Sequence, residues 1–393
     1  MNEKSFKLDF SSCMLIETIL VFCIGIFTLL KMSSVVSILF AISFIVLFFY
    51  CIKSFVIERR DLKQFALVIC LVLICVFNVV FNCIFSGGIL SFGYLKKLIM
   101  FCSFVLLIQF VVVNKNTRTK KITSIIKIFP AILAVFTLFS FFFLGNRRTM
   151  AGGITLGFSN PNVAALWVLH LLLFTILFSI DGIKKAKWKL ICLPIVLALL
   201  YLLLLTRSRS CILATLCFIC LALGGFLRRY FGRVFSFTIA VLPLAVTLIY
   251  LVFVDTEWFQ NFFSFMIDDG KTLYSRVNIW QDNLKEFWES PILGSYYGIS
   301  DGDGESQLHN THIDVLCSYG IIPAIMFIKL IYNAVRSMNF KEQSYYGYLA
   351  MCAFCSVIVA GTFEAAIVSG SMGLNILTAA FVWLAYDSDS IKK

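Results

Sequence analysis

The sequence has little charge and very little histidine. Charged residues make up 14% of the 393 residues, against roughly 25% in soluble domains. A chain that is 60% hydrophobic and this poor in charge cannot cover a water-facing surface, which excludes the soluble classes of protein. Two of its three histidines, His309 and His312, lie in one polar stretch, "GESQLHNTHIDVLCSYG", where we therefore look first for chemistry.

The sequence also lacks the cysteine spacings of a zinc site. Its fourteen cysteines lie almost entirely within or beside apolar runs, and none forms a CxxC pair on a loop. We therefore expect small apolar packing residues with free thiols, no metal site and no cofactor.

Long apolar runs recur along the whole chain. A bilayer core of about 30 Å needs roughly 20 apolar residues per helical span, and only helices and closed barrels satisfy the backbone inside lipid. These runs do not alternate as barrel strands would, so we predict an all-α integral membrane protein with a single transmembrane domain over residues 1–393. The predicted spans, about twelve in number, are residues 13–30, 34–52, 65–85, 98–113, 125–144, 162–180, 190–205, 211–226, 234–254, 312–332, 345–366 and 371–386.

The distribution of lysine and arginine predicts the orientation. With both termini cytoplasmic, the inner segments hold about two-thirds of the 33 basic residues, as the positive-inside rule requires. We predict a multi-pass protein of the cytoplasmic (inner) membrane. Because topology accounts for most of the net charge of +12, we expect the lipid bilayer and not nucleic acid as a partner.

One connection is long: residues 255–311, between the ninth and tenth predicted spans, on the extracytoplasmic side. Its middle part, "SRVNIWQDNLKEFWESP", spaces Val277, Trp280, Leu284 and Phe287 as on one face of a helix. We predict an amphipathic helix on the outer leaflet, with a lid that has no chemical role as the alternative.

Five arginines fall in predicted outer segments, where few are expected. Arg147 and Arg148 lie in "GNRRTMAGGITLGFSNPN", Arg207 and Arg209 in "LLLLTRSRSCILA", and Arg276 in the amphipathic helix. A guanidinium stays charged and donates paired hydrogen bonds to phosphate. The alternative is snorkelling to lipid phosphates. Five arginines on the side that holds both clustered histidines favour a phosphate-binding site.

The polar stretch supplies the candidate bases. His309 and His312 can accept protons near neutral pH, with Glu305 as a rival base. Two imidazoles alone do not make a metal site. His170 lies mid-span, where we expect an interhelical hydrogen bond. Asn162 follows the turn that begins a span, and it is a candidate to face the site.

These motifs, in this order, resemble the O-antigen ligase and polysaccharide polymerase superfamily, multi-span glycosyltransferases of bacterial surface-glycan assembly. The likeness rests on "RRTMAGGITLGFSNPN", on "LLLLTRSRSCILA", and on the long loop with "SRVNIW", "SPILG" and "HN". The family's last pattern is His, then Asn, Ser or Gly, nine residues, and Gly-x-x-Gly. Here His309 and Asn310 are followed by nine residues and Gly320, but Pro323 replaces the final glycine.

The resemblance implies a GT-C-like, metal-independent, inverting glycosyltransferase. Its donor would be a glycan on undecaprenyl pyrophosphate, and its acceptor a glycan or lipid-glycan hydroxyl at the outer face. His309 would be the catalytic base or an essential substrate contact, and Arg209 and Arg276 would bind the pyrophosphate. The remaining candidates are Arg147, Arg148 and Arg207 for pyrophosphate, and Asn162, Glu305, Asn310 and His312 in support.

Three alternatives stay open at this point. The enzyme could be a polymerase, which we favour, or a ligase, and its acceptor could instead be a protein hydroxyl. A flippase for lipid-linked oligosaccharides, or another transporter, is the rival from another class. A flippase needs polar residues along a path through the membrane, and Glu17 and Glu364 are its main candidates.

Overall fold

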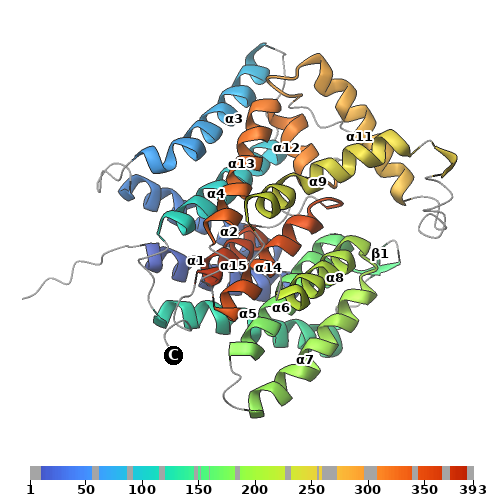
Figure 1. The fold of residues 1–393 in the computed structure, drawn as a ribbon. Coiled ribbons are helices and arrows are strands. Elements are labelled where there is room, and N and C mark those ends of the chain that lie inside the picture. Colours follow the sequence, from blue (N-terminus) through green and yellow to red (C-terminus); the bar gives the residue numbers. More distant parts are fainter. Residues whose placement is uncertain are drawn as a thin grey trace, which may run out of the picture.

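The computed structural model describes residues 10–54, 62–85, 92–114, 120–145, 149–150, 152–158, 160–181, 186–225, 232–254, 256–258, 272–295, 308–338, 344–364 and 372–386. Nearly all of these residues are helical (Figure 1). The helices are α1 (Phe10–Leu29), α2 (Ser33–Ile52), the 3₁₀ helix η2 (Leu62–Phe65), α3 (Ala66–Phe85), α4 (Phe92–Val113), α5 (Lys120–Phe143), α6 (Pro161–Asp181), α7 (Ala186–Leu205), α8 (Arg209–Leu223), α9 (Arg233–Phe253), α11 (Thr272–Glu289), α12 (Thr311–Tyr319), α13 (Ile321–Ser337), α14 (Tyr345–Ala360) and α15 (Met372–Ala385).

Each predicted apolar run coincides with a helix, and the run 312–332 coincides with two, α12 and α13. Within the described ranges, seven helices are long and apolar enough to cross a membrane: α1 to α6 and α9. Four shorter apolar segments lie in α7, α8, α14 and α15. The chain is thus a multi-pass helical membrane protein, while the count of twelve spans remains a prediction.

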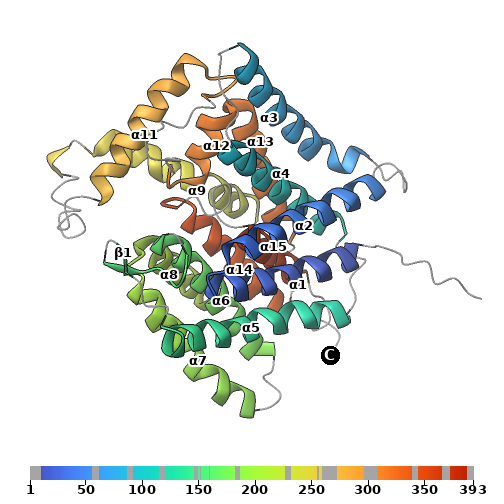
Figure 2. The ribbon, with the colours of Figure 1, turned by 180° about the vertical axis from the view of Figure 1, so that it is seen from behind.

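Helices α14 and α15 form the centre of the molecule, and the other helices surround them (Figures 1 and 2). Every residue of α14 from Tyr346 to Ala360 is buried. By contrast, α2 exposes a row of large apolar side chains, among them Ile45, Phe48 and Phe49, as a helix facing lipid does. His170 of α6 makes the expected interhelical bond, because its Nε2 lies 2.9 Å from Oγ1 of Thr378 in α15.

A small β-hairpin interrupts the helical pattern, which the all-helical prediction missed. Strand β1 (Thr149–Met150) pairs antiparallel with β2 (Gly153–Ile154). The hairpin presses against the turn between α7 and α8, since a Cβ at Gly153 would lie 2.4 Å from the Thr206 carbonyl oxygen. The motifs "RRTMAGGITLGFSNPN" and "LLLLTRSRSCILA" therefore pack together. Apolar periodicity carried no signal for strands only two residues long.

The break between α12 and α13 falls at Gly320, which has φ +93°. The backbone there contacts the turn after α11, because a Cβ at Gly320 would lie 2.0 Å from the Ile292 carbonyl oxygen. The amide of Ile321 donates to the Pro291 carbonyl at 2.9 Å. In α3, Asn78 donates to the carbonyl of Tyr319 at 2.6 Å. The "SPILG" motif thus packs on the bend that follows the polar stretch.

Candidate active site

His309 lies immediately before α12, where the loop meets the helix bundle. Its side chain is partly buried, with 21% of its surface exposed. Its φ of +47° is unusual for a residue with a side chain and costs roughly 1 to 2 kcal/mol. Neighbouring contacts must therefore hold this backbone in place.

Asn310 provides the first of these contacts. Its Oδ1 accepts hydrogen bonds from the amides of His312 and Ile313, both at 2.9 Å, and so caps α12. Its Nδ2 donates to Oγ1 of Thr247 in α9 and to the carbonyl of Thr362, each at 2.6 Å. One buried amide thereby joins α12 to α9 and to the end of α14.

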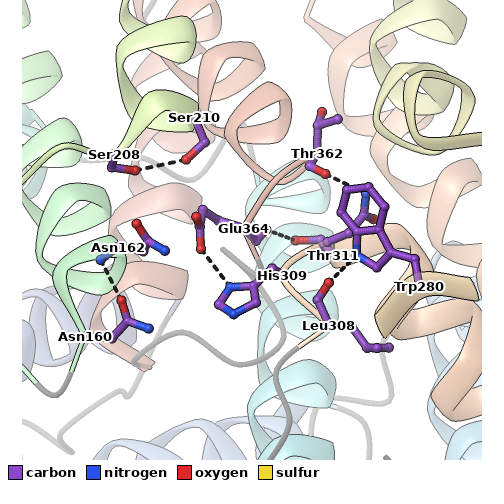
Figure 3. A network of polar contacts seen from close by, with 11 residues as sticks. Asn160, Asn162, Ser208, Ser210, Trp280, Leu308, His309, Thr311, Thr362 and Glu364 are labelled. Atoms are coloured by element: carbon purple, nitrogen blue, oxygen red, sulfur yellow. Dashed lines mark hydrogen bonds and ion pairs between the residues drawn. The ribbon is translucent and has the colours of Figure 1, made fainter. Parts of the chain in front are cut away.

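The turn that follows α14, residues Gly361–Glu364, lies against the His309 segment. The Thr311 amide donates to the Gly361 carbonyl at 2.9 Å, and the Thr311 hydroxyl donates to the Glu364 carbonyl at 3.2 Å. The Glu364 carboxylate then lies 3.2 Å from Nδ1 of His309. The Glu364 side chain is only 5% exposed. Figure 3 shows this pair at the centre of the polar network.

Trp280 of α11 contacts Leu308, the residue before His309. It is fully buried, its ring packs edge-on against Tyr250 of α9, and its Nε1 donates to the Leu308 carbonyl at 2.5 Å. Phe287 on the same face of α11 is also buried. The apolar face predicted for this helix therefore packs on protein at Trp280 and Phe287. The neighbouring Trp288 is 73% exposed.

Polar residues at the starts of α6 and α8 lie on the opposite side of the pair (Figure 3). The backbone amide of Asn162, in the first turn of α6, donates a hydrogen bond to Oδ1 of Asn160 at 2.8 Å. Beside it, the hydroxyls of Ser208 and Ser210 lie 3.0 Å apart, both almost fully buried. His309 and Glu364 thus lie between the starts of α6 and α8 and the α11–α12 side.

Arg207 and Arg209 are both exposed at the α7–α8 turn. Arg207 has φ +57°, and its guanidinium covers Gly152 of the hairpin, where a Cβ would lie 2.8 Å from Nη1. Arg209 is the first residue of α8. A helix N-terminus carries a partial positive charge, so a cation there is unfavourable unless an anion binds nearby.

Several predicted residues have no described side chain. Arg147, Arg148 and Glu305 lie outside the described residues, and for Arg276 only the backbone, in α11, is described.

His312 lies deeper than His309. Its side chain is buried, and its Nε2 donates to the carbonyl oxygen of Ala240 in α9 at 3.0 Å. Two residues further on, and so on roughly the opposite face of the helix, the buried carboxylate of Asp314 forms an ion pair with Lys97 of α4. Helix α12 is therefore held on two further sides, and His312 takes part in that packing.

Sequence reasoning did not place Glu364 in the site. A lone carboxyl group in an apolar segment indicates a functional residue, but from the sequence Glu364 is a candidate only for the membrane path of a transporter. Its contact with His309 joins residues 55 positions apart, which no local pattern reports. Among the described residues, no three His, Cys, Asp or Glu side chains are grouped so as to hold a metal ion.

Fold and site together define a helical membrane protein with a histidine–carboxylate pair at the end of one helix. Residues 193–328 match the family model described as O-antigen ligase, which confirms the resemblance over that part of the chain. The matched segment contains Arg207, Arg209, Arg276 and His309, and it ends before Glu364. It supports a function of the O-antigen ligase or polymerase type. No curated protein and no solved structure matches the chain.

Proposed function

We propose that this protein transfers a glycan from undecaprenyl pyrophosphate to an acceptor hydroxyl at the outer face of the membrane. The observation that carries the proposal is the fixed position of His309, inside the segment that matches the O-antigen ligase family and across from the polar start of α8. A lipid-linked donor suits such a protein, because its tail stays in the bilayer while its charged head reaches the surface.

In the proposed reaction, the acceptor oxygen attacks the anomeric carbon and its proton passes to His309. The bond from that carbon to the pyrophosphate breaks, and its electron pair leaves with the lipid pyrophosphate. Attack opposite the leaving group inverts the configuration. A positioned base of this kind typically contributes about 10² to 10⁴ in rate.

Arg209 and Arg276 are the proposed ligands of the pyrophosphate. Negative charge grows on the leaving group during the reaction, so fixed guanidinium donors stabilise the transition state and no metal ion is required. The position of Arg209 at the start of α8 supports this role, since the helix N-terminus and the guanidinium favour the same anion. Arg207, beside the hairpin, would assist.

We favour a polymerase over a ligase, and one experiment separates them. In a strain lacking the gene, a polymerase defect leaves single repeat units on the lipid carrier, whereas a ligase defect leaves finished chains on it. Lipid extracts analysed by mass spectrometry distinguish the two. If neither species accumulates and the surface glycan is unchanged, the proposed function is wrong.

A further inference from the structure

We propose that Glu364 is a positioning residue for His309: it fixes the imidazole as the tautomer with hydrogen on Nδ1, so that Nε2 is the proton-accepting atom. The role in transfer rests on the proposed function, whereas the tautomer does not. Glu364 lies beyond the family-matched segment, so the inference comes from the contact itself.

The chemistry of the two groups sets the direction of the hydrogen bond. An ionised carboxylate only accepts hydrogen bonds, whereas a neutral imidazole carries one N–H and one lone pair. Nδ1 of His309 lies 3.2 Å from Oε2 of Glu364, so Nδ1 must carry the hydrogen. Nε2 then holds the lone pair, as a general base requires.

The backbone geometry makes this pairing specific. Three hydrogen bonds join the two residues after His309 to the Gly361–Glu364 turn: Thr311 to Gly361, Asn310 to Thr362, and Thr311 to Glu364. A Cβ at Gly361 would lie 3.0 Å from the Thr311 hydroxyl, which shows how closely the segments approach. The carboxylate is therefore held in one place relative to the imidazole.

The pair also balances charge during the transfer. When the acceptor O–H bond breaks, a new N–H bond forms on Nε2, while Nδ1 keeps its hydrogen. The resulting imidazolium lies beside a carboxylate of which only 5% is exposed, where opposite charge is effective. Nε2 later releases its proton to water, and Glu364 stays ionised throughout, as in other carboxylate–histidine pairs.

The first test compares Glu364→Gln and Glu364→Ala with a control in the same protein. Glu17 of α1 also has a buried carboxyl group, which accepts a hydrogen bond from Ser43 of α2, and neither helix holds a site residue. We expect kcat to fall about 10²-fold or more in both Glu364 variants. KM for the lipid-linked donor and the membrane level should change little, and Glu17→Gln should keep wild-type kcat. Wild-type kcat in Glu364→Gln would overturn the proposal.

The second test needs no activity. The chain has only three histidines, so ¹⁵N-histidine labelling of the purified protein gives three imidazole spectra, and His309→Asn identifies that of His309. At a pH where the ring is neutral, we expect the hydrogen on Nδ1 in the wild type and a loss of this preference in Glu364→Ala. Hydrogen on Nε2 in the wild type would refute the proposal, even if the variants fail to insert. If the tautomer is as expected but His309→Asn transfers glycan normally, the proposed function fails instead.

Discussion

The indole of Trp280 donates a hydrogen bond to the carbonyl oxygen of Leu308 over 2.5 Å, and so joins the middle of α11 to the residue before His309. Trp280 is completely buried, and Leu308 is nearly so. The "SRVNIW" motif therefore helps to position the polar stretch, although the two are 28 residues apart in sequence. This part of the long connection thus contacts the segment that carries His309.

Replacing Trp280 with Phe should impair glycan transfer while leaving the fold in place. Phenylalanine keeps the ring packed against Tyr250 but removes the N–H, which leaves the buried Leu308 carbonyl without that donor. An unsatisfied buried group costs about 1 to 3 kcal/mol, so activity should fall about tenfold or more. The measurement is transfer from purified lipid-linked donor. Trp288→Phe, at a ring that is 73% exposed, is the matched control and should behave as wild type.

Replacing Gly320 with Ala should destabilise the whole protein. At φ +93° and ψ 175°, a backbone region that is essentially restricted to glycine, a side chain is strained by roughly 1 to 3 kcal/mol, and its Cβ would also overlap the Ile292 carbonyl oxygen. We expect a low membrane level and a lower melting temperature in detergent. Gly224→Ala is the control, because that glycine has φ −71° and open space around its Cβ position. Equal stability of the two variants would mean that the α12–α13 bend tolerates a side chain.

Replacing Arg209 with Lys should reduce activity severely at a normal membrane level. Lysine keeps the charge but loses the planar pair of donors that suits a pyrophosphate. Arg336→Lys is the control, since that exposed side chain bonds to Tyr332 at 2.7 Å on α13. If Arg209→Lys matches the wild type in kcat and in KM for the donor, Arg209 does not bind pyrophosphate and anchors the protein to lipid instead.

The sequence predicted the helices well because a span inside lipid must satisfy its own backbone and be apolar over its length. It predicted the helix α11 from the spacing of Trp280, Leu284 and Phe287, which pack together. It did not predict the hairpin of Thr149 to Ile154, because two-residue strands have no detectable period.

The sequence located His309 but not its partner. Histidine in a polar stretch is conspicuous in a chain with three histidines, whereas the meeting of His309 and Glu364 depends on how the end of α14 packs on the start of α12. The same holds for Asn310, whose hydrogen bonds reach Thr247 in α9 and Thr362 in the turn after α14. Long-range contacts of this kind come only from the tertiary structure.

The most direct measurement is glycan transfer from purified lipid-linked donor by His309→Ala and His312→Ala, with membrane level checked for both. We expect His309→Ala to lose transfer entirely. His312→Ala should retain a substantial fraction, since its imidazole bonds to the Ala240 carbonyl inside the helix packing. An active His309→Ala protein beside an inactive, well-inserted His312→Ala protein would contradict the assignment of His309 as the base.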